Sequence, residues 1–191
     1  MNNYVFIGPP GAGKGTMAKK MAEEFGYTHL STGDLIRNEQ QKGSALGKLA
    51  DQLIDQGNLL PDKVVIEMFQ NFILDNPTKV GYIFDGFPRT PEQAKHFSAF
   101  LLKARIPFTN AVYLDLPPHV SLARLLKRAE IEDRKDDTKE TIQHRLRVYD
   151  AKTKPILKFF HDRGKLLTID AQGTPEEQYA RLKDALELKT V

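Results

Sequence analysis

The sequence contains no cysteine, which excludes disulfide bonds, thiolate metal sites and a cysteine nucleophile. Its five histidines are scattered without the spacing of metal ligands, and we expect ordinary surface or boundary positions for all of them: His29, His96, His119, His144 and His161. No apolar run approaches the length of a membrane-spanning helix, so we expect no membrane partner. Residues 1–3 lack the positive charge of a signal peptide, which favours a cytoplasmic location.

The overall composition is that of a globular protein. The 191 residues are 40% hydrophobic and 28% charged, which fits one domain with a single core. The sequence shows no internal repeat, linker or low-complexity tract. The net charge is only +3, but the isoelectric point near 9.0 fits anionic ligands.

A glycine-rich stretch, GPPGAGKGT at residues 8–16, lies between an apolar run and a helical pattern. Glycines let successive backbone N–H groups point inward, and the positive end of the following helix adds to their attraction for a polyphosphate. The pattern GxxxxGK is satisfied by Gly8, Gly13 and Lys14, although Gly15 stands where a hydroxyl residue usually follows the lysine. The alternative is a glycine turn that binds nothing. Strand, spacing, lysine and helix together favour a phosphate-binding loop.

Five apolar, β-favouring segments alternate with helical patterns. We predict strands at residues 4–7, 28–31, 82–84, 111–116 and 166–170. This alternation predicts an α/β P-loop fold of three layers, with a five-stranded parallel sheet and helices on both faces. Residues 32–73 read as mostly helical and form a candidate mobile lobe. A long helix is expected from about residue 138 to residue 163, bent near Pro155.

Polar clusters follow three of the predicted strands, at residues 8–16, 31–37 and 85–89. Ligands bind beyond the carboxyl ends of parallel strands, so we expect these clusters to share one cleft. Asp85 and Asp34 are candidate magnesium ligands, directly or through water. Each has a simpler alternative, as a turn or cap residue for Asp85 and as a helix cap for Asp34.

A second group of arginines comes later in the chain. Arg124 and Arg128 are four residues apart and share a helix face, Arg134 lies in the charged stretch at residues 130–140, and Arg145 opens the long helix. Such a stretch alone is usually a solvated surface. Beside a phosphate loop, arginines on a closing flap would neutralise charge on a transferred phosphoryl group, and no protein nucleophile is needed.

Taken together, five motifs resemble the adenylate kinase family: GPPGAGKGT, STGDLIR, DGFPRT followed by xxQ, LLKR, and DRKDD followed by xxETxxxR. The match runs from Val5 to the fifth predicted strand. The resemblance implies reversible conversion of MgATP and AMP to two ADP, and it implies a monomer. It also implies one P-loop kinase domain over residues 1–191, with an AMP-binding lobe at residues 31–60 and a short lid at residues 127–137. The resemblance also implies Mg²⁺ with ATP. The lid is short and cysteine is absent, so we expect no structural zinc.

The resemblance also implies roles for individual residues. Those assigned to ATP are Gly11, Ala12, Gly13, Lys14, Gly15, Thr16, Arg124, Arg128 and Gly173. Those assigned to AMP are Thr32, Arg37, Asn58, Leu59, Leu60, Gly86, Phe87, Pro88, Arg89, Gln93, Arg134 and Arg145. The residues expected to act on the transferred phosphoryl group are Lys14, Arg89, Arg128, Arg134 and Arg145.

Three interpretations of the function remain from the sequence. The first is AMP phosphorylation, and the second is a related kinase acting on UMP or CMP; Thr32 and Thr90 favour the first. The third is a nucleotide-gated module that binds RNA. It lacks the interleaved aromatic and basic residues of such modules, so we expect no nucleic-acid partner.

Overall fold

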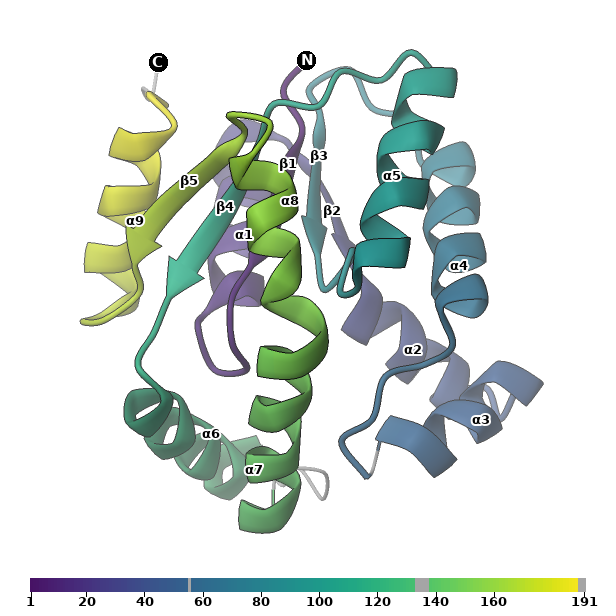
Figure 1. The fold of residues 1–191 in the computed structure, drawn as a ribbon, viewed down its shortest axis with the longest axis vertical. Coiled ribbons are helices and arrows are strands. Elements are labelled where there is room, and N and C mark those ends of the chain that lie inside the picture. Colours follow the sequence, from purple (N-terminus) through teal and green to yellow (C-terminus); the bar gives the residue numbers. More distant parts are fainter. Residues whose placement is uncertain (55, 133–137, 189–191) are drawn as a thin grey trace.

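Five parallel strands form the centre of the computed structural model, which describes residues 1–54, 56–132 and 138–188 (Figure 1). The strands are β1 (Tyr4–Ile7), β2 (Thr28–Ser31), β3 (Tyr82–Asp85), β4 (Asn110–Asp115) and β5 (Leu166–Asp170). Their order across the sheet is β2-β3-β1-β4-β5, with every neighbouring pair parallel. The predicted α/β class and all five predicted strands are confirmed, with ends shifted by at most one residue.

Strand β1 shows why the sheet is covered on both faces. All four of its residues are buried. Successive side chains of a strand point to opposite faces, so both faces of the sheet must be covered here. Tyr4 and Phe6 pack in the cluster that includes α1 (Lys14–Phe25) and α9 (Pro175–Ala185). Val5 and Ile7 pack in the cluster that includes α4 (Asp62–Asp75), α5 (Pro91–Lys103) and α8 (Pro155–His161). The predicted three layers are therefore present (Figure 1).

The order of the strands creates a switch point beside β1. The chain leaves β1 toward β2 on one side, whereas the connection after β3 crosses to β4 on the other side. Phe6 pairs in register with Asp85, so the ends of β1 and β3 lie next to each other. Ligands of open α/β sheets bind at such points.

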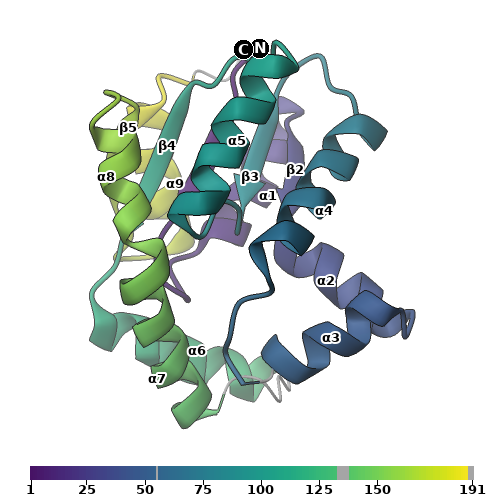
Figure 2. The same ribbon diagram turned by 45° about the vertical axis from the view of Figure 1, so that its right-hand side comes forward.

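The predicted helical stretch from residue 32 to residue 73 forms α2 (Thr32–Gln41), α3 (Ala45–Ile54) and most of α4. Helices α2 and α3 lie at the edge of the molecule where the strands end (Figure 2). They pack so closely that a Cβ atom at Gly47 would overlap the carbonyl of Glu39 and lie 2.8 Å from the Cα of Gln40.

The aromatic ring of Phe69 joins α4 to the segment that follows β3. It stacks on Phe87 at 4.5 Å between ring centroids, and its other ring contacts include Phe84 at 5.4 Å and Phe97 at 5.5 Å. Aromatic pairs at these distances add to the stabilisation from burial. This cluster fixes the position of the turn after β3 relative to α4 and α5.

The predicted long helical segment and its disturbance near Pro155 are present, but the disturbance is a π-helical turn and not a simple bend. The structure has α7 (Lys139–Val148), a π-helical turn (Tyr149–Thr153) and α8, in direct succession. The N–H of Lys154 donates to the carbonyl of Tyr149 at 2.8 Å, a bond over five residues. The ring of Pro155 would clash with the carbonyl of residue 151 in a regular helix, and a wider turn avoids this. Because α7 ends at Val148, Arg145 lies in its last turn. The expectation that Arg145 opens the long helix is therefore wrong.

Threonine caps begin three of the helices, since Thr90, Thr138 and Thr174 each accept an N–H bond from the residue three positions later. The capping box at Thr174 and Glu177 is complete. At Thr90 the Gln93 side chain does not complete the box, because its carbonyl oxygen accepts the N–H of Arg89. The remaining helix is α6 (Pro118–Glu132). Within the described ranges, every helix is too short or too polar to cross a membrane.

The Gly47→Ala variant tests the close packing of α2 on α3. Alanine favours a helix by up to about 1 kcal/mol over glycine, but the clash with backbone atoms of α2 should cost about 1–3 kcal/mol. We therefore expect a lower melting temperature by calorimetry. Lys48→Ala, at an exposed neighbouring position, is the control and should melt like the native protein. An unchanged melting temperature for Gly47→Ala would mean that the two helices separate without cost.

Candidate active site

The glycine-rich loop curls between β1 and α1. Gly11 and Gly13 have left-handed backbone angles, φ +82° and +88°, which other residues rarely adopt. Helix α1 begins at Lys14, directly after Gly13, so its free N–H groups face the loop. The predicted phosphate-binding loop is therefore formed in the structure, with the geometry that anions require.

Three other elements hold this loop in place. A Cβ atom at Gly8 would lie 2.7 Å from the carbonyl oxygen of Leu114 in β4. Ser121 of α6 donates a hydrogen bond to the carbonyl of Pro10. A Cβ atom at Gly13 would lie 2.9 Å from Oε1 of Gln178 in α9. The loop thus rests on β4, α6 and α9 as well as on its own turns.

The Lys14 side chain lies back across the loop. Its Nζ donates to the carbonyls of Gly8 at 2.9 Å and Pro9 at 3.0 Å. The pKa of Lys14 is lowered to about 8, chiefly because burial disfavours the ammonium form. The carboxylate of Asp85 opposes this shift, and three further cations strengthen it: Arg89, Arg145 and Arg128.

Asp85 ends β3 and faces the loop. Its Oδ2 would lie 3.4 Å from a Cβ atom at Gly15, which places the carboxylate against the start of α1. The same oxygen lies 3.5 Å from Nε2 of His29, a buried nitrogen without a hydrogen-bond partner among the described residues. His29 has intermediate burial, which agrees with its predicted boundary position, but it lies beside the candidate site.

Asp34 is engaged elsewhere. Its N–H donates to the Ser31 hydroxyl at 3.2 Å, and its carboxylate pairs with Arg37 one turn along α2. Burial alone would raise the pKa of Asp34, but the hydrogen bonds from Arg37 and Ser31 hold it below its usual value. Across the described ranges, no three His, Cys, Asp or Glu side chains form a group that could hold a metal.

The turn after β3 brings Thr32, Gly86 and Arg89 together. Thr32 donates its hydroxyl to the carbonyl of Asp85 at 3.3 Å, and Nε of Arg89 donates to the carbonyl of Gly86 at 2.8 Å. Gly86 has φ +82°, and a Cβ atom there would collide with the Thr32 hydroxyl and lie 2.8 Å from Nη2 of Arg89. Phe87 is buried in the aromatic cluster, and a cis peptide bond joins it to Pro88.

Gln93 lies directly behind this turn and is buried. Its Oε1 accepts the N–H of Arg89 at 2.7 Å, and its Nε2 donates to Asp62 at 2.8 Å. Sequence analysis gave Asp62 no role in the site. The contact links α4 to α5 over 31 residues, so no local pattern could have predicted it.

The segment after α3 reaches α7. Oδ1 of Asn58 lies 2.9 Å from Nε2 of His144, which has intermediate burial. Gly57 lies so near α7 that a Cβ atom would be 2.9 Å from Cγ of Arg145. Leu60 is buried in the core beside α4. Gly57 therefore lies against Arg145, and Asn58 contacts His144, the residue before Arg145.

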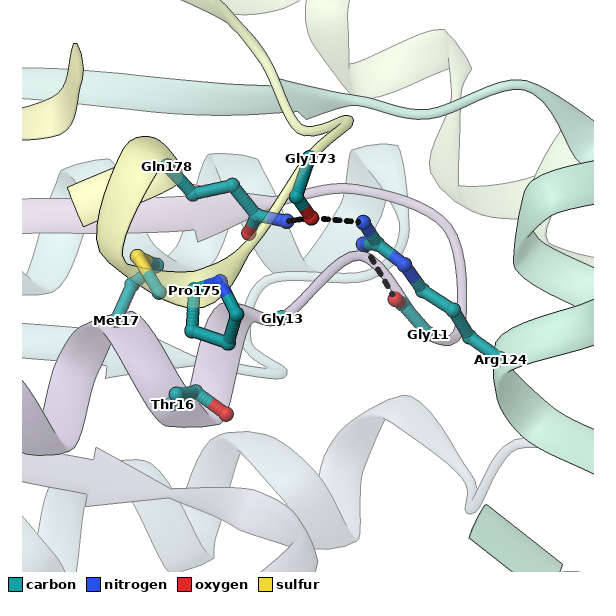
Figure 3. A pocket seen from close by; sticks show the side chains of 8 residues that line it. All are labelled: Gly11, Gly13, Thr16, Met17, Arg124, Gly173, Pro175 and Gln178. Carbon is teal, nitrogen blue, oxygen red and sulfur yellow. Dashed lines mark hydrogen bonds between the residues drawn. The ribbon is translucent and has the colours of Figure 1, made fainter. Parts of the chain in front are cut away.

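A cavity of about 210 Å³ opens beside the glycine loop (Figure 3). Arg124 donates to the carbonyls of Gly11 at 3.4 Å and Gly173 at 3.0 Å, so it joins the loop to the segment after β5. The residues that line the cavity are Gly11, Gly13, Thr16, Met17, Arg124, Gly173, Pro175 and Gln178. The predicted ATP residues Arg124 and Gly173 are thus in contact with each other.

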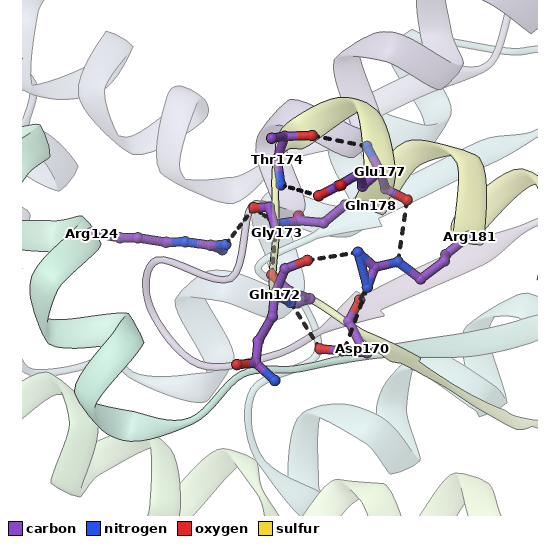
Figure 4. Close-up of polar contacts among 9 residues, drawn as sticks. Arg124, Asp170, Gln172, Gly173, Thr174, Glu177, Gln178 and Arg181 are labelled. Atoms are coloured by element: carbon purple, nitrogen blue, oxygen red, sulfur yellow. Dashed lines mark hydrogen bonds and ion pairs between the residues drawn. The ribbon is translucent and has the colours of Figure 1, made fainter.

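Gln178 was missed by the sequence analysis. It is a buried polar residue of α9, four positions before the buried Leu182. This spacing puts Gln178 on the buried face of the helix, and it was the available signal in the sequence. Its Nε2 donates to the carbonyl of Ala171 at 2.6 Å. Figure 4 shows the polar contacts that fix the neighbouring segment, in which Arg181 donates to the carbonyls of Asp170 at 3.0 Å and Gln172 at 2.7 Å.

The predicted lid is only partly visible. Residues 127–132 belong to α6, whereas Arg134 and the rest of residues 133–137 lie outside the described residues. Arg128 and Arg145 act electrostatically on Lys14, so the structure brings both near the loop.

A glycine loop of this kind at the switch point of a parallel sheet places the protein in the class of P-loop proteins that bind polyphosphates. Comparison with known proteins narrows the class. A family model for adenylate kinase matches residues 6–165, so the chain belongs to the adenylate kinase family. It is an enzyme, a phosphotransferase of the nucleoside monophosphate kinase type.

Curated relatives match almost the whole chain. An adenylate kinase of Thermus thermophilus is 40% identical over 182 residues, covering 95% of both chains. That of Maricaulis maris is 40% identical over 187 residues, covering 98% of this chain and all of the relative. That of Leptospira biflexa is 41% identical over 177 residues, covering 93% of this chain and 95% of the relative.

The lowered pKa of Lys14 predicts that polyphosphate binding takes up a proton above about pH 8. Free Lys14 loses its proton in this range, whereas a bound phosphate favours the charged form and raises the pKa. The Kd for ATP should therefore increase as the pH rises above about 8. Titration calorimetry in two buffers of different ionisation enthalpy counts the protons directly.

Two variants identify the group that takes up this proton. Lys14→Met should abolish the uptake, and Lys19→Met, at an exposed position of α1, should preserve it. Equal uptake by Lys14→Met and the native protein would assign the proton to another residue.

Proposed function

We propose that this protein transfers the terminal phosphoryl group of MgATP reversibly to AMP, giving two ADP. The observation that carries the proposal is the electrostatic cluster in which Lys14 lies near Arg89, Arg128 and Arg145. Lys14 and Arg89 follow β1 and β3, and Arg128 of α6 and Arg145 of α7 act on Lys14 electrostatically. Four cations grouped in this way suit two nucleotides whose phosphates meet. Family membership supports the same reaction.

The donor, ATP, is assigned to the glycine loop and the cavity beside it. Backbone N–H groups of residues 11–16 would bind its phosphates, and Lys14 would leave its two carbonyl partners for the outer phosphates. The contacts of Arg124 with Gly11 and Gly173 support the base and ribose side of this site. Arg181 holds the carbonyls of Asp170 and Gln172, which favours a preformed pocket.

The acceptor, AMP, is assigned to the turn after β3 and the residues around it. Arg89 is held by the carbonyl of Gly86 at 2.8 Å and would contact the phosphate. Thr32 and Gln93 flank this turn and would contact the base, with residues 58–60 lining the same site. Arg37 reaches Asp34 along α2 and has its side chain partly exposed, so it remains accessible to a phosphate.

Phosphoryl transfer needs no protein nucleophile, so the protein mainly positions the two nucleotides and neutralises the negative charge of the transferred group. Lys14, Arg89, Arg128 and Arg145 would neutralise charge that shifts to the moving group and hold both nucleotides in line. Arg134 is proposed to join them from the lid.

Mg²⁺ with ATP is part of the proposal. The Asp85 carboxylate fits a magnesium shell, directly or through water, because it faces the start of α1 in a cluster that is otherwise cationic. The ion would neutralise charge on the ATP phosphates. Asp34 is paired with Arg37, so we leave it out of this shell.

Two inserted parts are proposed to close over the substrates, an AMP-binding lobe at residues 31–60 and a short lid at residues 127–137. The close packing of α2 on α3 supports the first. The lid is proposed to carry Arg134. The monomeric state and the cytoplasmic location stay predictions from the sequence.

A coupled assay of ADP formation tests the proposal, with AMP, CMP and UMP offered separately at saturating MgATP. We expect AMP to be the preferred acceptor. Lys14→Met should retain the fold by circular dichroism and lose roughly 10²-fold or more in kcat, the effect of removing one preorganised charged donor. Lys19→Met is the matched control. Preference for CMP or UMP would overturn the acceptor assignment, and a fully active Lys14→Met variant would overturn the role of the loop.

Replacement of Gln93 tests how the base is recognised. Gln93→Leu removes the amide while keeping the bulk, so kcat/KM should fall more for AMP than for CMP or UMP, by about 1–3 kcal/mol per polar group left unpaired. Measuring all three acceptors with the same enzyme preparation gives the ratio directly. An equal fall for the three would assign Gln93 to the support of α5 alone.

A further inference from the structure

Asp62, the first residue of α4, joins two helices behind the proposed acceptor site. Its Oδ1 accepts hydrogen bonds from Nε2 of Gln93 at 2.8 Å and from the hydroxyl of Thr90 at 3.1 Å. Both partners lie at the start of α5, about thirty residues further along the chain. An ionised carboxylate only accepts hydrogen bonds, so it fixes the direction of each of these contacts.

The opposite end of the Gln93 amide is fixed by a group that only donates. Its Oε1 accepts the backbone N–H of Arg89 at 2.7 Å. A side-chain amide has ends of nearly equal shape, so it can turn over when its surroundings allow. Here the turned amide would face its NH₂ group toward the Arg89 N–H and its oxygen toward Asp62. Both hydrogen bonds would be lost at a side chain that is only 1% exposed, where unpaired polar groups are costly.

The fixed orientation has a chemical consequence. The Nε2 group carries a second hydrogen and Oε1 a second lone pair, so each end can make one more hydrogen bond. Adenine offers an acceptor at N1 and a donor at its 6-amino group, which match such an amide. Hypoxanthine and guanine offer the reverse order, a donor at N1 and an acceptor at O6, with nearly the same shape. An amide that could turn over would accept either kind of purine.

We propose that Asp62 is a positioning residue that determines specificity. It holds the Gln93 amide in the orientation that pairs with a 6-aminopurine and excludes a 6-oxopurine. Asp62 acts through Gln93 and does not itself contact the base. This inference rests on the proposed assignment of AMP to the acceptor site, which it deepens.

The test compares kcat/KM for AMP and for inosine monophosphate at saturating MgATP. In Asp62→Ala the amide keeps only the Arg89 contact, so turning over becomes easier. We expect the preference for AMP over inosine monophosphate to fall about tenfold, the effect of one buried hydrogen bond of about 1.4 kcal/mol. Lys63→Ala, at the next and exposed position of α4, should leave the preference unchanged.

Asp62→Asn tests whether an acceptor-only group is required. Asparagine keeps the size of the side chain, but its amide can present either a carbonyl or an NH₂ group, so it no longer fixes the direction of the Gln93 amide. We expect the preference for AMP over inosine monophosphate to fall in Asp62→Asn as it does in Asp62→Ala, whereas loss of the negative charge alone would change kcat/KM for both nucleotides alike. An unchanged preference in Asp62→Asn would mean that the carboxylate does not fix the amide and would overturn the proposal. If Asp62→Ala does not fold, Asp62→Ser replaces it in the test. The serine side chain is too short to keep the hydrogen bond with Gln93.

Two further outcomes keep this inference distinct from the proposed function. If the native enzyme does not phosphorylate AMP, the proposed function itself fails. If it does, but Asp62→Ala lowers kcat/KM equally for AMP and inosine monophosphate, the function stands and Asp62 is purely structural.

Discussion

Repulsion among cations is the constraint on which this active site depends. Lys14 lies near three arginines, and its pKa of about 8 reflects both its burial and their charge. The unliganded protein tolerates this arrangement because backbone carbonyls hold the Lys14 ammonium group and Asp85 supplies one opposing charge. The framework that keeps these groups together is the pair β1 and β3, whose ends are in register. A bound polyphosphate adds negative charge to this cluster, so relief of the repulsion becomes a source of affinity.

Much of the fold could be predicted because its signals are local. A buried parallel strand is a short apolar run, and a phosphate loop is a run of nine residues with fixed spacing, so β1 and the loop after it were identified together. The five strands and the caps at Thr90 and Thr174 were predictable for the same reason. The π-helical turn before Pro155 was not, since proline indicates a disturbance of a helix without indicating its form.

The parts of the site that escaped prediction depend on contacts between distant residues. Gln178 supports Gly13 from the far end of the chain, and Asp62 holds Gln93 across 31 residues. His29 looked ordinary because its neighbour Asp85 is brought close only by the pairing of β2 with β3. Family resemblance assigned the residues that contact substrates, whereas these supporting residues became visible only when the strands and helices were assembled.

The support of the glycine loop by α9 has a consequence for the order in which the protein matures. The loop is among the first segments to be synthesised, yet Gln178, which packs against Gly13, and Gly173, which contacts Arg124, are among the last. A nascent chain that has formed β1, α1 and β3 therefore still lacks part of its nucleotide site. The complete site, and with it the full stabilisation by a bound nucleotide, therefore forms only after α9 has been made. A chain truncated before α9 would lose this support at its opposite end.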